Sequence, residues 1–262
     1  MSLLKGINLG YQIDDISILK AIDIEVKAGE MVGLIGPNGA GKSTLLRLLT
    51  CVEKPGWGEI FYGDNNVDQI SVEERAKHIG YLVQGAKAYW PFSVEKTVGL
   101  GRIPHQKWWQ HSSREDQEKI QRAMEITETL AYRNRIVSTL SGGEQTLVML
   151  ARIFATDPQI IFADEPVAAL DPYHQLHVME ILRNHSRDDR AAVVVLHDLS
   201  LAARFCDRLY IINHGCLYGS GAPDEIMTAE NIAEVYGVKA RITCDAEGVS
   251  VAPVSRLGEH HP

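Results

Sequence analysis

A glycine-rich segment near the N-terminus constrains the fold of this 262-residue chain more than any other feature. It reads Gly36-Pro37-Asn38-Gly39-Ala40-Gly41-Lys42-Ser43 and fits the pattern G-x-x-x-x-G-K-[ST]. The apolar run 31–35 before it predicts a buried strand, and the leucines within 45–49 predict a buried helix. Such a loop turns backbone N–H groups toward a triphosphate, while Lys42 reaches the β- and γ-oxygens and Ser43 ligates Mg²⁺. The alternative is a glycine-rich turn that only lets a helix pack.

A pair of acidic residues supplies further oxygen ligands. Asp164 and Glu165 follow the apolar run 160–162, which is typical of a buried strand. Asp164 would hold Mg²⁺, directly or through water, and Glu165 would accept a proton from the attacking water. By themselves these residues could equally end a strand in a solvated acidic turn. Downstream of a phosphate loop they indicate a hydrolytic site.

The rest of the chain alternates between strand and helix patterns. The polar and apolar alternation in 16–19 and 22–26 predicts half-buried antiparallel strands. Further strands are expected at 79–83, 160–162, 192–196 and 209–212, and helices at 71–80, 173–185, 199–206 and 228–236, the last ending at Gly237 before a short polar end. Strands separated by helices indicate an α/β fold with a largely parallel sheet covered on both faces.

Between residues 87 and 156 the composition changes to aromatic residues and a charged helical stretch at 113–130, which predicts an inserted helical subdomain.

Composition also limits the class of protein. With 45% hydrophobic and 23% charged residues, a disordered, collagenous or coiled-coil chain is excluded. The net charge of −8 and the lack of a Lys/Arg-dense stretch argue against a nucleic-acid partner.

Membrane and redox features are sparse. No run approaches 18 apolar residues, and the N-terminus lacks the layout of a signal peptide, so we expect any membrane role to come through a partner. Four cysteines are far apart and form no C-x-x-C pair, so we expect reduced packing residues in a cytosolic protein: Cys51, Cys206, Cys216 and Cys244.

The segment Leu140-Ser141-Gly142-Gly143-Glu144 decides the family. Ser141 and Glu144 fit a capping box, and the glycines between them leave the backbone amides at the helix start open to an anion. In isolation this is an ordinary well-capped helix. About 20 residues before the acidic pair and downstream of the phosphate loop, it resembles the signature segment of the ATP-binding cassette family. The resemblance covers nearly the whole chain.

The resemblance implies roles for several residues. Residues 36–43 with Thr44 match the Walker A loop of a P-loop NTPase with a RecA-like core, an N-terminal antiparallel β subdomain and an inserted helical subdomain. Gln84 matches the glutamine that contacts Mg²⁺ and the attacking water, and His197 the switch histidine that senses the γ-phosphate. Asp164 and Glu165 match Walker B and the general base.

The same resemblance implies a homodimer in which two ATP molecules lie between the signature of one subunit and the phosphate loop of the other. Asp171 matches the loop that crosses the dimer interface. Tyr11 matches the aromatic residue that stacks on adenine, although its spacing alone is also compatible with a strand core residue. ATP binding would close the dimer, and hydrolysis would reopen it.

Two segments narrow the resemblance. Leu100-Gly101-Arg102-Ile103-Pro104-His105, which follows 89–94, and residues 197–204 resemble the subgroup that powers iron-siderophore, haem and cobalamin importers. This implies an ATPase subunit at the cytoplasmic face of the inner membrane, acting with a separate permease and, indirectly, a substrate-binding protein. The alternatives are a soluble cassette protein acting on ribosomes or DNA, or a subunit for another transported substrate. We expect a single cassette domain spanning 1–262, with the helical subdomain at about 87–156.

The chain also departs from the family pattern. Gln145-Thr146-Leu147 stands where relatives often carry Arg-Gln-Arg, and Val167 where a hydroxyl residue is common, so we expect altered interface contacts or rate. The aromatic residues at Trp90 and 108–109 would either pack within the insertion or dock a permease. The adjacent histidines 260–261 have no fixed geometry, and we do not expect a metal site there.

Overall fold

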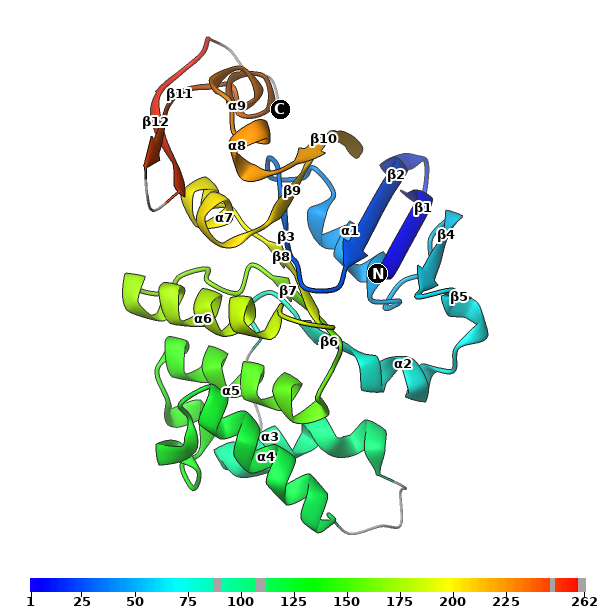
Figure 1. The fold of residues 1–262 in the computed structure, drawn as a ribbon, viewed down its shortest axis with the longest axis vertical. Coiled ribbons are helices and arrows are strands. Elements are labelled where there is room, and N and C mark those ends of the chain that lie inside the picture. The colour runs from blue at the N-terminus through cyan, green and yellow to red at the C-terminus, as the bar shows by residue number, and fades with distance from the viewer. Residues whose placement is uncertain (87–90, 107–111, 246–247, 259–262) are drawn as a thin grey trace. The chain divides into compact units, whose positions relative to one another are not determined.

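The computed structural model of the protein describes residues 1–86, 91–106, 112–245 and 248–258, drawn in colour in Figure 1. The chain divides into two compact units. The first unit contains residues 1–67 and 186–262, and the second contains residues 68–185. Within the described ranges, no helix is both long and apolar enough to cross a membrane.

The first unit opens with an antiparallel sheet. Its strands run in the order β2-β1-β4-β5, and they are β1 (Ser2–Ile13), β2 (Ile16–Lys27), β4 (Trp57–Tyr62) and β5 (Asn65–Asn66). The predicted antiparallel pairing is confirmed, but the two predicted strands 16–19 and 22–26 are one continuous strand. The pairing register shifts between Leu19 and Ile22, where Ala21 has a left-handed φ of 56°. A bulge of this kind interrupts the alternation without ending the strand.

A second group of strands in the first unit carries the phosphate loop. Strand β3 (Met31–Ile35) pairs in parallel with β8 (Ala191–Val195) and with β9 (Arg208–Asn213), and β10 (Cys216–Gly221) is antiparallel to β9. All residues of β3 and β8 are buried, which explains their continuous apolar sequence. Helix α1 (Lys42–Leu49) follows β3, and α7 (Leu199–Phe205) follows β8. The predicted strands and helices at these positions are confirmed.

The end of the chain differs from the expectation. Helix α8 (Pro223–Ile226) and helix α9 (Ala229–Tyr236) are followed by a hairpin of β11 (Val238–Asp245) and β12 (Gly248–Arg256). Gly237 ends α9 with φ of 64°, as predicted. The prediction of a short polar end after it is wrong, because a β-hairpin follows. The hairpin packs on α7, where the Ser200 hydroxyl accepts from the Val251 N–H at 3.0 Å and donates to its carbonyl at 3.2 Å. In β12 only Val251 is buried, so hydrophobic alternation gives little signal.

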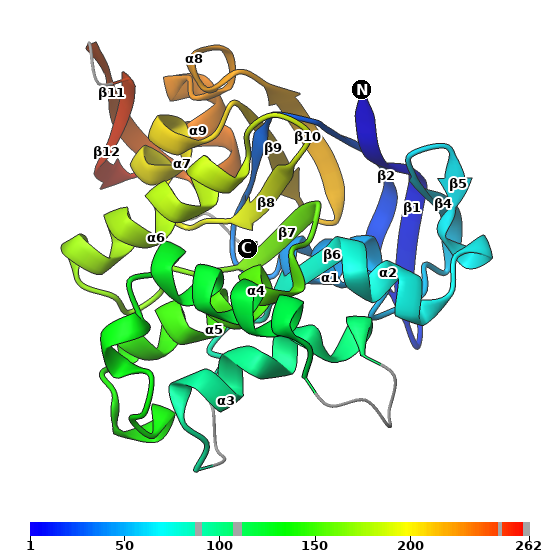
Figure 2. The ribbon, with the colours of Figure 1, turned by 60° about the horizontal axis from the view of Figure 1, so that its bottom comes forward.

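The second unit joins a short parallel pair of strands to helices. Strand β6 (Ile79–Leu82) pairs with the fully buried β7 (Ile160–Asp164). The helices are α2 (Val72–His78), α3 (Val94–Gly99), α4 (Arg114–Ile126), α5 (Gly142–Thr156) and α6 (Pro172–His185), with a 3₁₀ segment over Leu100–His105. Helices α3 and α4 pack on α5 (Figure 2). The predicted elements of this unit are confirmed to within a few residues at their ends.

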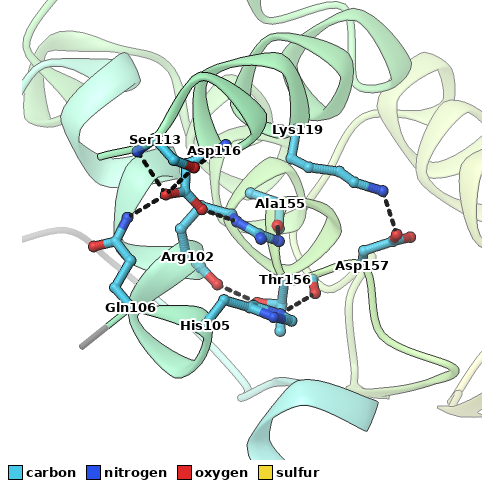
Figure 3. A network of polar contacts seen from close by, with 10 residues as sticks. Arg102, His105, Gln106, Ser113, Asp116, Lys119, Ala155, Thr156 and Asp157 are labelled. Carbon is cyan, nitrogen blue, oxygen red and sulfur yellow. Dashed lines mark hydrogen bonds and ion pairs between the residues drawn. The ribbon is translucent and has the colours of Figure 1, made fainter. Parts of the chain in front are cut away.

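The segment 100–105 is held to two of these helices through the buried residues Gly101 and Arg102 and through His105 (Figure 3). The Arg102 guanidinium donates to Asp116 of α4 and to the carbonyl of Ala155 in α5, both at 2.8 Å. The His105 ring donates from Nε2 to the carbonyl of Thr156 at 2.9 Å. Gly101 is required because a Cβ there would lie 2.0 Å from the Arg152 carbonyl oxygen. The motif therefore fixes the 3₁₀ segment to α4 and α5.

The cysteine prediction is partly wrong. None of the four cysteines forms a disulfide in the described structure, and Cys206 is a buried packing residue against Gly33. Cys216 and Cys244, by contrast, are exposed. Both lie on strands with few buried residues, where sequence spacing does not reveal which face is covered.

Candidate active site

The phosphate loop joins β3 to α1 through glycines in backbone conformations that other residues rarely adopt. The φ angles are 145° at Gly36, 77° at Gly39 and 102° at Gly41. At Gly36 a Cβ would lie 2.0 Å from the Ile212 carbonyl oxygen. Glycine is therefore required for both conformation and close approach, which leaves the loop N–H groups able to line an anion site.

Lys42 is 5% exposed, and its ammonium group is held by the loop itself. Its Nζ donates to the carbonyl oxygens of Gly36 and Pro37, both at 2.8 Å. Ser43 and Thr44 follow in the first turn of α1 and are half-buried. The loop thus presents a cation, two hydroxyls and the N-terminus of a helix in one place, which is the donor set that a polyphosphate requires.

A cavity of about 550 Å³ borders residues 36–40 in the first unit. His197 lines it, so the structure brings the predicted switch histidine to the phosphate loop. Three further polar residues that the sequence reasoning missed also line it: Asn213, His214 and Tyr236. They come from the end of β9, the turn after it and the end of α9, and no local sequence pattern marks them.

Contacts of the loop explain why those missed residues are there. The Gly215 N–H donates to the Ala40 carbonyl at 3.2 Å, which ties the β9–β10 turn to the phosphate loop. The Tyr236 hydroxyl is buried beside the backbone of Gly36, and burial raises its pKa well above the ordinary value. Tyr236 therefore stays protonated at all physiological pH values.

Tyr11 lies on β1, away from these contacts in the sequence, and is half-buried. The carboxylate of Glu53 beside its hydroxyl raises the pKa of Tyr11. Glu53 also pairs with Arg47 of α1 at 3.3 Å. The ring is not a fully buried strand core residue, and its contact with adenine stays a prediction.

In the second unit, β7 ends at the candidate Walker B residues. Asp164 is 3% exposed. Glu165 follows it with a left-handed φ of 51°, and its Oε2 accepts a hydrogen bond from Gln84 Nε2 at 2.5 Å. The structure thus brings Gln84, which comes just after β6, to the predicted general base.

The signature segment begins α5 with the predicted capping box. The Ser141 hydroxyl accepts from the Glu144 N–H at 3.3 Å, and the Glu144 carboxylate accepts from the Ser141 N–H at 2.7 Å. The Ser141 N–H holds the pKa of Glu144 below its usual range, and the Tyr132 hydroxyl adds to the effect. Ser141 and Gly142 are exposed, so the start of this helix is accessible to an anion.

A second cavity, of about 390 Å³, lies within this unit and is lined by Gln84, Glu165 and Gly142. The departures from the family pattern, Gln145 and Thr146, line it too. Gln145 donates to the Leu140 carbonyl at 2.9 Å and Thr146 to the Gly142 carbonyl at 3.1 Å, so both side chains brace the start of α5. Val167 is buried and packs inside the unit.

Asp171 does not line this cavity but stands exposed just before α6. Its carboxylate accepts from the backbone N–H of His174 at 3.0 Å and from the ring Nδ1 at 2.7 Å. The backbone bond first, and the ring second, hold the pKa of Asp171 below its usual range. Other aromatic and histidine positions singled out in the sequence lie outside the described residues: Tyr89, Trp90, Trp108, Trp109, His260 and His261.

Comparison with known families decides what these groups form. A family model for ABC transporters matches residues 19–168, more than half of the chain. The chain belongs to the ABC transporter family. It is an ATPase of that family, and both the fold and the family resemblance expected from the sequence are confirmed.

Individual ABC proteins match over most of their length. The hemin import ATP-binding protein HmuV of Streptomyces coelicolor is 40% identical over 84% of this chain and 78% of its own. The ferric enterobactin transport ATP-binding protein FepC of Escherichia coli is 33% identical over 92% of this chain and 90% of its own. The dimeric, ADP- and phosphate-bound ABC cassette MJ0796 superposes with a TM-score of 0.73 at 29% identity, covering 84% and 98% of the two chains.

Proposed function

We propose that this ABC ATPase energises the import of a metal chelate of the iron-siderophore, haem or cobalamin type. One observation carries the proposal: the chain is 33–40% identical, over most of its length, to ATP-binding subunits named for hemin import and ferric enterobactin transport. Residues 100–105, which resemble the same subgroup in sequence, lie in the helical part of the chain and are held there through Arg102 and His105. The full chain then acts as one cassette domain, with the helical insertion at about 87–156.

Transport requires partner proteins, and we assign them from the way in which ABC family members act. The chain works as a homodimer at the cytoplasmic face of the inner membrane, bound to integral permease subunits, with a substrate-binding protein acting from the other side. The dimeric cassette MJ0796 supports the dimer. The net charge of −8 favours these protein partners over nucleic acid.

ATP binds through residues 36–44, and in the dimer the signature segment 141–144 of the second copy completes the site, with Asp171 at the interface. Tyr11 stacks on the adenine. Lys42, whose Nζ donates to the carbonyl oxygens of Gly36 and Pro37 at 2.8 Å, exchanges these two partners for phosphate oxygens. Glu165 accepts the proton of the attacking water, which Gln84 orients, and His197 contacts the γ-phosphate.

Magnesium fits the donor atoms of the chain. Ser43, Gln84 and Asp164 offer a hydroxyl, an amide carbonyl and a carboxylate, the hard oxygen ligands that Mg²⁺ accepts while keeping several waters. In the described parts of the chain, no group of three or more His, Cys, Asp or Glu side chains is placed to hold a metal ion. When bound, it neutralises charge on the phosphates. Gln84 donates its amide N–H to Glu165, so its carbonyl oxygen is the atom that would bind the ion.

Uptake by the reconstituted transporter tests the proposed substrate class. The chain is assembled with its permease in vesicles, and ATP-driven uptake of an iron-siderophore, haem and cobalamin is measured in parallel. We expect uptake of one of the three, lost in the Glu165→Gln variant. ATP hydrolysis with no uptake of any of them would contradict the chelate class and leave the ATPase intact, and hydrolysis stimulated by RNA or DNA would contradict the transporter role.

A further inference from the structure

A histidine that the sequence motifs do not include lies between two interface segments of the second unit. His174 is in the first turn of α6, and its ring Nδ1 is 2.7 Å from Oδ2 of Asp171. Because a carboxylate only accepts hydrogen bonds, Nδ1 carries the proton and donates. The backbone N–H of His174 donates to the other oxygen, Oδ1, at 3.0 Å, so both carboxylate oxygens of Asp171 are bound by one residue.

The other side of the same ring meets the signature segment. A Cβ on Gly143 would lie 2.7 Å from Cδ2, 2.8 Å from Cγ and 3.0 Å from Nε2 of His174. The imidazole therefore occupies the space that a side chain at position 143 would need. Helices α5 and α6, which carry the two residues, lie side by side in both views (Figures 1 and 2).

The ring is also held from a third direction. Tyr173 packs edge to face against it, with the ring centroids 5.5 Å apart, and itself stacks on His177 at 6.1 Å. The His174 side chain is 24% exposed. A ring with a charge-assisted hydrogen bond, a backbone contact and an aromatic neighbour has few rotamers open to it.

We infer that His174 is a positioning residue that fixes Asp171 to the signature segment at Gly143, so that both segments enter the dimer interface as one rigid surface. The inference rests on the proposed function, in which Gly143 and Asp171 face the nucleotide and the second copy. Preorganising two interface segments lowers the conformational entropy that dimer closure would otherwise cost. Without the ring, each segment would have to be ordered separately when ATP binds.

The dimer affinity of the full chain measures this effect separately from ATP hydrolysis. In a Glu165→Gln background with Mg²⁺ and ATP, the dimer dissociation constant is determined by analytical ultracentrifugation. Adding His174→Ala should weaken the dimer about tenfold, the loss expected for one hydrogen bond to a charged group. Affinity for a fluorescent ATP analogue in the monomer should stay within about twofold, because His174 does not line the phosphate-loop cavity.

His177→Ala is the matched control. His177 lies one turn further along α6, 3.7 Å from Glu128, and stacks on Tyr173 and not on Asp171 or Gly143, so its loss should leave the ATP-dependent dimer unchanged. His174→Asn is the variant to use where His174→Ala fails to fold: it keeps a donor for Asp171 and removes the ring from Gly143, and an intermediate weakening is expected. Equal dimer affinity in the parent, His174→Ala and His174→Asn would overturn the inference.

A double-mutant cycle tests the contact itself. Gly143→Ala alone places a methyl group against the His174 ring and should weaken the dimer, whereas His174→Ala in the same chain frees the space. The two effects should therefore be less than additive, and strict additivity would contradict the contact. If the Glu165→Gln parent itself fails to dimerise with ATP, the proposed ATP-sandwich dimer is wrong; if it dimerises and His174→Ala has no effect, only the role of His174 is wrong.

Discussion

Glu165 adopts a left-handed backbone conformation, with φ of 51°, directly after the buried strand β7. For a residue with a Cβ this conformation costs about 1 kcal/mol or more, and it persists where neighbouring structure holds it. Here the fully buried β7 and Gln84, at 2.5 Å from the carboxylate, hold it. The conformation directs the carboxylate into the cavity that it shares with Gly142.

A prediction at the level of single residues concerns Lys42. Lys42→Ala removes the ammonium group that contacts Gly36 and Pro37 and, in our proposal, the phosphate oxygens. We expect ATP affinity to fall by about tenfold or more, since hydrogen bonds to charged groups contribute about 1.5–3 kcal/mol each. Isothermal titration with ATP measures it, with the exposed lysine variant Lys96→Ala as control. Unchanged affinity in Lys42→Ala would contradict the role of the loop.

The sequence predicts functional residues where the chemistry needs fixed spacing. Lys42 and Ser43 follow the loop glycines directly, and Glu165 follows its strand, so local pattern is enough. His174 and Tyr236 are different, because their places depend on how α6 packs on α5 and how α9 packs on the phosphate loop. A histidine within a helix start and a tyrosine before a C-cap glycine carry no pattern that reveals such contacts.

At the scale of elements, the helical part of the chain depends on one buried ion pair. Arg102 and Asp116 have side chains that are 5% and 7% exposed. Burial raises the pKa of Asp116, but hydrogen bonds from Arg102, Ser113 and Gln106 outweigh it and hold the pKa well below its usual range. Because its pKa is lower in the folded than in the unfolded state, the stabilisation is present above about pH 4 and is lost as the pH falls through the folded value.

Asp116→Ala should therefore be strongly destabilising. It leaves the Arg102 guanidinium buried without its carboxylate, and removal of one partner of a buried pair costs about 3–5 kcal/mol. Urea unfolding at pH 7 measures the change. Glu118→Ala on the same helix is the control, since it breaks the exposed pair with Arg114 and should cost less than about 1 kcal/mol. Equal effects of the two substitutions would show that the ion pair is dispensable.

Elements were predictable where apolar residues repeat with a clear period. Strands β3 and β8 are short and wholly apolar, and α5 begins at a capping box, so their identities follow from the sequence. The bulge at Ala21 and the hairpin β11–β12 were not predictable. The first depends on pairing with β1, and the second contacts α7 through hydrogen bonds between the Val251 backbone and the Ser200 hydroxyl.

For the whole molecule, the family match assigns a function that composition alone does not indicate. The chain is acidic, and no helix among its described residues could span a membrane. In the proposed function such a chain supplies ATP turnover, and its partners determine what is transported. Residues 100–105 illustrate the limit of inference from sequence: they resemble a chelate-import subgroup, yet the described contacts of Arg102 and His105 are internal to the second unit. The subgroup therefore has to be tested through uptake.

Steady-state ATP hydrolysis by the Glu165→Gln variant tests the central claim most directly. Phosphate release is measured at saturating Mg²⁺ and ATP, beside wild type and the exposed control Glu118→Gln. Because a general base contributes about 10²–10⁴-fold to a rate, we predict a loss of at least about 100-fold with ATP affinity within about twofold of wild type. Hydrolysis at the wild-type rate in Glu165→Gln would contradict the assignment of the base and the mechanism built on it.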